Sequence, residues 1–80
     1  MTRVTIRYWA AAKSAAGVAE DQVDADTLDE ALRLAVASRG VALERVLARC
    51  SFLVDGVRAD RSAQLPSGGT VEVLPPFAGG

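Results

Sequence analysis

Apolar and polar residues alternate in several short segments of the chain, and this two-residue period is typical of β-strands. The alternation is clearest near the N-terminus, where Val4 and Ile6 would share one face of a strand and Trp9 would lie on the other. Asp55-Gly56 favours a two-residue hairpin turn between two of the expected strands. These strands cover residues 4–9, 21–25, 52–54, 57–58 and 70–74.

One longer segment has the period of an α-helix instead. Thr27 and Glu30 fit a capping box at its start, and Gly40 is a typical helix stop. Its apolar residues fall on a single face: Leu28, Ala31, Leu32, Ala35 and Val36. A short helix is also expected in the alanine-rich residues 10–16, which end at Gly17. Another is expected where the apolar face would comprise Leu43, Val46, Leu47 and Cys50.

The order strand, strand, helix, strand, strand, strand predicts an α+β fold, in which a mixed sheet of four to five strands packs against one main helix plus short helices. Eighty residues suffice for one domain. We expect this domain to span residues 1–74, followed by a flexible C-terminal tail over residues 75–80. The predicted core comprises Val4, Ile6, Tyr8, Leu28, Leu32, Ala35, Leu47, Phe52, Val54, Leu65, Val71 and Val73.

The composition argues against several classes of function. The chain has no histidine and a single cysteine, Cys50, so it lacks a Ser-His-Asp or Cys-His arrangement, a disulfide framework and a cluster of metal ligands. Nine basic and ten acidic residues, spread along the chain, argue against a nucleic-acid partner. No apolar segment approaches the roughly 20 residues that cross a membrane, and no signal-peptide pattern opens the chain. We therefore expect a cytoplasmic protein that is not an enzyme and binds neither a metal nor a cofactor.

The end of the chain has a different character from the rest. No charged side chain occurs in the last six residues, Pro75, Pro76, Phe77, Ala78, Gly79 and Gly80. Prolines favour an extended conformation, and glycines present a backbone without side chains. Six extended residues reach about 20 Å, so the carboxylate of Gly80 could enter the active site of another protein and be activated there. The alternatives are a frayed end and a chain that was cut at this position.

Together these segments resemble the ubiquitin-like β-grasp sulfur carriers of the MoaD/ThiS group, and most closely the small subunit of molybdopterin synthase. The resemblance covers nearly the whole chain, and its most specific part is the closing segment. The matching segments are residues 4–17, 27–32, 54–56, 65–71 and 74–80. Gly69-Thr70 and Phe77-Ala78 depart from the usual pattern, and the second departure leaves the pathway more open than the carrier role.

The resemblance implies that a ubiquitin-activating-like adenylyltransferase uses ATP to adenylate Gly80, which is then converted to a thiocarboxylate. Gly79 would keep the end slim. The tail would next enter the large subunit of molybdopterin synthase, in a heterotetramer of two small and two large chains. There the sulfur would pass to a pterin during molybdenum cofactor biosynthesis. The partner-binding residues of the tail would be Pro75, Pro76, Phe77 and Ala78.

Other functions share part of this pattern. A sulfur carrier for cysteine, thiamin or tRNA thiolation would use the same activation chemistry and differ only in its acceptor. A ubiquitin-like modifier would instead be joined to lysines of other proteins. A pure interaction module would not need Gly80 at all.

Two further features suggest sites in the folded domain. By parity, Trp9 and Leu74 point away from the core, and the resemblance makes their strands neighbours. They would then form an exposed apolar patch for a partner, unless a loop or the tail packs over them. Cys50 could carry a persulfide, but its position on an apolar helix face favours simple burial.

Overall fold

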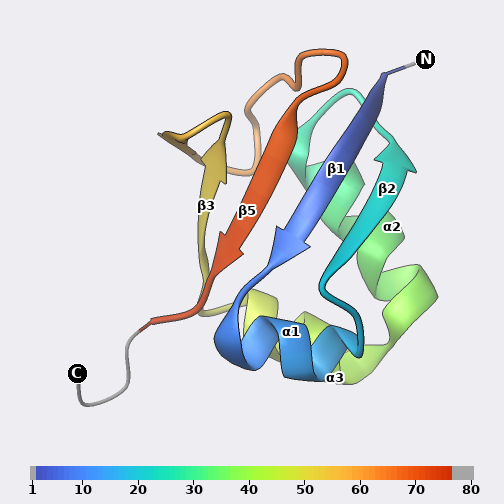
Figure 1. Ribbon diagram of the computed structural model, residues 1–80, viewed down its shortest axis with the longest axis vertical. Helices are drawn as coiled ribbons and strands as arrows, with labels where there is room; N and C mark the ends of the chain where they lie inside the picture. The colour runs from blue at the N-terminus through green and yellow to red at the C-terminus, as the bar shows by residue number, and fades with distance from the viewer. Residues whose placement is uncertain (1, 77–80) are drawn as a thin grey trace.

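The computed structural model of the chain describes residues 2–76 and shows one mixed sheet with helices behind it and at one end (Figure 1). The strands are β1 (Arg3–Tyr8), β2 (Glu20–Asp24), β3 (Ser51–Val54), β4 (Val57–Ala59) and β5 (Thr70–Leu74). The helices are α1 (Ala10–Ala16), α2 (Leu28–Arg39) and α3 (Val41–Leu47). The α+β class and the order of the elements are those that the sequence predicted.

The five strands lie in the order β2-β1-β5-β3-β4. The first and last strands of the chain, β1 and β5, are parallel neighbours in the middle of the sheet, and all other pairs are antiparallel. This is the mixed sheet that the β-grasp resemblance implied. The first strand ends one residue earlier than expected, because Trp9 leaves the ladder and becomes the N-cap of α1.

The main helix begins and ends where its capping residues predicted. The Thr27 hydroxyl accepts a hydrogen bond from the Glu30 N–H at 3.2 Å, which satisfies one of the free donors of the first turn. The Glu30 carboxylate reaches one residue further back than a capping box requires and accepts the Asp26 N–H at 2.8 Å. At the other end Gly40 has φ 105°, and its N–H donates to the Val36 carbonyl at 2.8 Å.

The third helix is shorter than its apolar pattern suggested. It ends at Leu47, and Cys50 lies outside it, directly before β3. The prediction that Cys50 belongs to this helix and is buried was therefore wrong, because the chain leaves the helix in a turn closed by the Cys50 N–H on the Leu47 carbonyl, 3.1 Å away. The Cys50 side chain is half-buried.

The core lies between the sheet and the helices, and it contains every predicted core residue except Val54. Val54 is only half-buried because it ends the short strand β3 opposite Val57, which is 69% exposed. The sequence analysis did not include five further buried residues in the core: Ala12, Ala16, Ala25, Ala31 and Leu43. Small side chains on α1 and α2 allow these helices to approach the sheet closely.

A polar cluster joins β1, β2 and the end of α2. The Tyr8 hydroxyl donates to the Asp21 carboxylate at 2.8 Å, and the Arg39 guanidinium binds the same carboxylate through two nitrogens. The hydrogen bonds from Arg39 lower the pKa of Asp21, and burial raises the pKa of Tyr8. The cluster fixes the C-terminal end of α2 against the sheet.

Candidate functional site

The C-terminal segment leaves the sheet from its centre. Because β5 is parallel to β1, the C-terminal ends of these two central strands lie at the same end of the sheet, next to α1 and α3 (Figure 1). The backbone N–H of Trp9 donates to the Val73 carbonyl at 3.2 Å, which brings the start of α1 beside the end of β5. Pro75 is half-buried at this edge and Pro76 is exposed.

Four residues of the predicted site, Phe77, Ala78, Gly79 and Gly80, lie outside the described residues. Their assigned roles in activation and partner contact stay predictions. The structure does describe the part of the domain from which they start, and the geometry of that part can be tested against the expected patch and the expected partner contacts.

Trp9 lies on the face of the sheet that is turned away from the helices. Its indole N–H donates to the Glu72 carboxylate at 3.1 Å. The Arg7 guanidinium stands 5.1 Å from the centroid of the Trp9 ring, a cation–π distance. Arg7 and Glu72 are direct partners in the β1–β5 ladder, so two strands hold the indole in place. The alternation of residues along the first strand already predicted that Trp9 and Arg7 share this face. The hydrogen bond from Trp9 to Glu72 could be found only from the pairing of β1 with β5.

Leu74 shares this outer face, because it lies two residues beyond Glu72 on the same strand. It is half-buried and pairs with Ser51 of β3, whereas Trp9 remains 41% exposed. The structure thus places Trp9 and Leu74 on one face at the end of the sheet where the C-terminal segment leaves. We call these two residues the Trp9–Leu74 patch. Its role in partner binding stays a prediction.

A groove borders the start of the C-terminal segment on the helical side, and the sequence analysis missed it. It is open to solvent and has a volume of about 630 Å³. Its apolar walls come from Ala11, Val46, Ala48, Pro75 and Pro76. Its polar groups are the guanidinium groups of Arg45 and Arg49, which line the same space. We call this the tail-root groove. The sequence signal that could have indicated it was the pair of arginines four residues apart, one in the last turn of α3 and one just beyond it.

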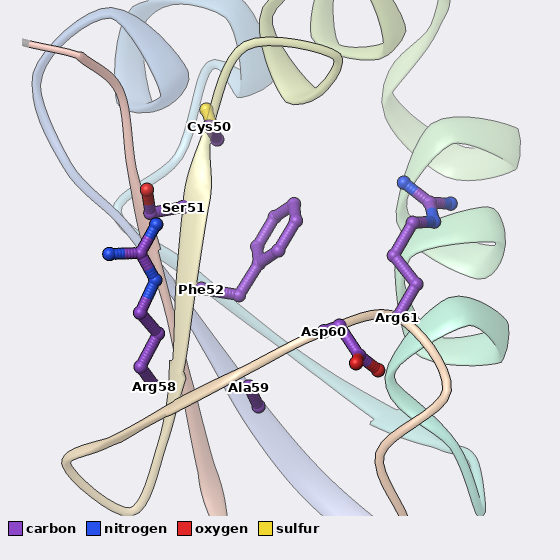
Figure 2. A pocket seen from close by; sticks show the side chains of 7 residues that line it. All are labelled: Cys50, Ser51, Phe52, Arg58, Ala59, Asp60 and Arg61. Atoms are coloured by element: carbon purple, nitrogen blue, oxygen red, sulfur yellow. The ribbon is translucent and has the colours of Figure 1, made fainter.

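A second hollow, of about 490 Å³, lies beside β3 and β4 (Figure 2). Figure 2 shows Arg58 on one side of β3, with Phe52 and Arg61 on the other. Arg61 is bound to Asp29 at 2.7 Å, and Arg33 binds the other oxygen of the same carboxylate at 3.1 Å. One negative charge is thus shared by two arginines, and the charge on the helical side of this hollow is only partly neutralised.

Cys50 lies at the rim of this second hollow. Its thiol lies 3.1 Å from the Val46 carbonyl, to which it donates a hydrogen bond, and burial raises the pKa of the thiol. Both effects favour the neutral thiol over the thiolate, and the thiolate is the nucleophile in persulfide chemistry. The geometry thus speaks against a persulfide on Cys50.

The described residues show few groups for chemistry of their own. Within residues 2–76 no cluster of three or more His, Cys, Asp or Glu side chains is placed to hold a metal ion. In the same part of the chain, no helix has the length and apolar character needed to cross a membrane. Among the exposed features of residues 2–76, the Trp9–Leu74 patch and the tail-root groove both adjoin the start of the C-terminal segment.

A five-stranded mixed sheet with parallel first and last strands around one main helix defines a small ubiquitin-like β-grasp protein. Residues 6–80 match the profile of the ThiS family, and the chain belongs to this family. No match was found among curated proteins.

Solved structures agree with this assignment. Small archaeal modifier protein 1 from Haloferax volcanii is 26% identical, with a TM-score of 0.86 over 98% of this chain and 99% of that one. The protein of the same name from Methanosarcina acetivorans is 19% identical, with a TM-score of 0.88 over 100% and 98%. In a complex of subunits 1 and 2 of molybdopterin-converting factor from Helicobacter pylori, the matching chain is 24% identical, with a TM-score of 0.74 over 99% and 100%. The chain is therefore a small protein of the type that serves as a sulfur carrier or a ubiquitin-like modifier.

Proposed function

We propose that this protein carries sulfur on the carboxyl group of Gly80 and acts as the small subunit of molybdopterin synthase in molybdenum cofactor biosynthesis. The observation that carries the proposal is the family match, which runs through the final Gly79-Gly80. The fold supports it, because the C-terminal segment follows directly from β5, the middle strand of the sheet, and leaves the domain at the end of that strand.

The chemistry needs two steps before sulfur can be donated. A carboxylate is a poor electrophile, so its oxygen first attacks the α-phosphate of ATP, pyrophosphate leaves, and an acyl-adenylate forms. Sulfide (HS⁻) from a sulfur donor then attacks the carbonyl carbon, a C–S bond forms, AMP leaves, and the product is the thiocarboxylate. Glycine at positions 79 and 80 lets a narrow active site approach this carbonyl from several sides. The catalytic groups for both steps come from a ubiquitin-activating-like adenylyltransferase.

The thiocarboxylate then acts as the sulfur donor. Its sulfur forms a C–S bond to the pterin precursor in the large subunit and displaces an oxygen substituent there. Water then attacks the acyl carbon, the acyl C–S bond breaks with the sulfur left on the pterin, and the carboxylate is restored. The partner seen with the related chain from Helicobacter pylori, subunit 2 of molybdopterin-converting factor, supports a large subunit of this kind here. The Trp9–Leu74 patch and Pro75, Pro76, Phe77 and Ala78 would supply the contacts of the small subunit.

A second function is favoured by one observation. The similarity to small archaeal modifier protein 1 from Haloferax volcanii, at 26% identity over nearly the whole chain, supports a role as a ubiquitin-like modifier. Both functions require activation of Gly80 and diverge afterwards. A modifier ends on a lysine of another protein, whereas a carrier returns to its free carboxylate after each cycle.

The test is a reconstitution with the purified protein, an activating enzyme of this type, ATP and a sulfur donor. Intact-mass spectrometry should show one oxygen replaced by sulfur at the C-terminus. Adding the large subunit and the pterin precursor should then yield molybdopterin. A variant without Gly80 should fold normally and fail in the first step.

Other outcomes would decide against the proposal. Failure of the intact protein to be adenylated would remove both the carrier and the modifier functions. A thiocarboxylate that forms but gives no molybdopterin, while passing sulfide to a serine-derived acceptor, would assign the protein to cysteine synthesis. Lysine-linked conjugates in cell extracts, without turnover of the thiocarboxylate, would identify a modifier.

A further inference from the structure

The tail-root groove combines two free positive charges with an apolar floor. Arg45 and Arg49 are exposed, and neither forms an ion pair with another side chain of residues 2–76. Other arginines of the domain do have such partners, among them Arg3, Arg39 and Arg61. None of the residues lining the groove is acidic. The groove therefore presents charge that the domain itself does not neutralise.

Local structure holds the two arginines on one side of the domain. Arg45 lies in the last turn of α3, and the chain continues to turn through Arg49, whose N–H donates to the Val46 carbonyl at 3.0 Å. Helix α3 packs against α1 at the edge where the C-terminal segment leaves (Figure 1). Arg45 and Arg49 thus line the same groove as Pro75 and Pro76, together with Val46 and Ala48, which lie between the two arginines in sequence.

Acidic side chains gather at the opposite end of the molecule. Asp26 and Glu30 flank the start of α2 and line one hollow with Thr2; Asp24, at the end of β2, lines it too but is paired with Arg3 at 3.1 Å. In Figure 1 this end, where β1 begins, lies away from the edge at which the C-terminal segment leaves. A separation of charge of this kind orients a protein as it approaches a charged partner. It would turn the tail-root groove toward an acidic surface.

The length of the C-terminal segment fixes where that surface must be. Gly80 follows Pro76 by four residues, which span at most about 13 Å. An active site that reacts with Gly80 must therefore come within this distance of Pro76, and Pro76 is itself a wall of the groove. The protein that activates Gly80 therefore approaches the end of the domain that holds Pro76, where the tail-root groove lies on the helical side and the Trp9–Leu74 patch on the outer face of the sheet.

The geometry points to the tail-root groove as the docking site for an acidic segment of the activating enzyme. In this arrangement carboxylates of that segment pair with Arg45 and Arg49, and an apolar side chain between them packs on Val46, Ala48 and Pro75. The inference rests on the proposed function only in its first step, the activation of Gly80. It applies to a sulfur carrier and to a modifier alike, because both need that step.

Charge reversal tests the inference. In ATP-dependent pyrophosphate exchange with the activating enzyme, the double variant Arg45→Glu/Arg49→Glu should raise the KM for the carrier by at least about tenfold, with kcat little changed. The KM of the intact protein should rise with added NaCl, and that of the variant should not, because salt screens attraction between opposite charges. Circular dichroism and thermal unfolding establish that the variant is folded, and the milder Arg45→Ala/Arg49→Ala pair repeats the measurement without introducing repulsion.

The matched control is Arg3→Glu/Arg33→Glu. It changes the net charge of the protein by the same amount at two exposed positions outside the groove. Its KM should stay near that of the intact protein. Equal KM increases in the two double variants would show a net-charge effect and overturn the assignment of the groove.

The remaining outcomes are also decisive. An unchanged KM in the groove variants, with normal activation of the intact protein, overturns the inference and leaves the proposed function standing. If the groove variants instead weaken only the binding of the molybdopterin synthase large subunit, the inference is also overturned, because the groove would then bind a different partner. No activation of the intact protein would remove the proposed function, and the inference with it.

Discussion

Trp9 and Glu72 are 63 residues apart in the chain, yet the indole N–H of Trp9 donates to the carboxylate of Glu72 at 3.1 Å. The contact spans the two central strands of the sheet on their outer face, and Arg7 covers the ring from the other side. An exposed tryptophan held in one orientation needs little further ordering when a partner covers it, and this lowers the entropic cost of binding. The relationship makes Trp9 the best anchor in the described part of the chain.

Replacing Trp9 by alanine should weaken the complex with the large subunit by about 10- to 100-fold in Kd, as expected for a buried aromatic anchor. The free domain should also lose some stability, since the side chain is only 41% exposed and its indole N–H donates to Glu72, so thermal unfolding must establish that the variant is folded. Isothermal titration calorimetry measures the Kd. The control is Val57→Ala, a more exposed apolar residue on β4. Similar losses in both variants would argue against a specific role for Trp9.

Asp21→Asn should destabilise the domain by about 1–3 kcal/mol, because the substitution removes the charged acceptor shared by Tyr8 and Arg39. The Asp21 side chain is 15% exposed, so water replaces these hydrogen bonds only in part. Urea unfolding at neutral pH measures the change. Asp24→Asn, which removes only an exposed pair with Arg3, should cost no more than about 1 kcal/mol. A loss as large in the second variant would contradict a special role for the cluster.

The same carboxyl should make the domain sensitive to acid. Arg39 lowers the pKa of Asp21 in the folded state, so the unfolded chain binds its proton first as the pH falls. The stabilisation is complete above the unfolded pKa of about 3.9, and it is lost as the pH falls through the folded value. The difference in unfolding free energy between the intact protein and Asp21→Asn should therefore shrink below about pH 4. Asp29 and Asp60 also have lowered pKa values, through Arg61 and Ser62, so some acid sensitivity should remain in the variant. A constant difference from pH 7 to pH 2 would contradict this.

Ala10→Gly should stabilise the domain by about 0.5–1 kcal/mol. Ala10 has φ 48° at the start of α1, a left-handed conformation that costs a residue with a Cβ atom roughly 1–2 kcal/mol. Glycine adopts it without that penalty, although it loses some conformational entropy on folding. Thermal unfolding gives the sign. The neighbouring substitution Ala11→Gly, inside the same helix, should instead destabilise by about 0.5–1 kcal/mol.

Cys50→Ala should leave activation of Gly80 unchanged, because the thiol is hydrogen-bonded to Val46 and its pKa is raised. Alkylation of Cys50 by iodoacetamide should be slower in the folded protein than in urea, where the thiol is free. Loss of thiocarboxylate formation in this variant would revive a persulfide role for Cys50.

Local patterns predicted most of the elements, and the reasons are visible in single residues. Thr27 caps the start of the main helix and Gly40 caps its end, each through a hydrogen bond to a residue three or four positions away in the chain. Asp55 and Gly56 form the expected hairpin turn, with φ 49° and 82°. Errors occurred where distant contacts override a local pattern. The apolar spacing that ends in Cys50 would continue a helix, but the chain turns there into β3, which pairs with the last strand.

The sequence by itself determined the faces of the strands, the caps of the main helix and the distinct character of residues 75–80, because each of these depends on neighbours within about one helical turn. The tertiary structure decided which distant groups meet. It placed Glu72 against Trp9, Arg39 against Asp21, and Arg45 and Arg49 beside Pro76. Side-chain period and capping carry no information about partners more than a few residues away, so these contacts could only be found once the strands were paired and the helices packed.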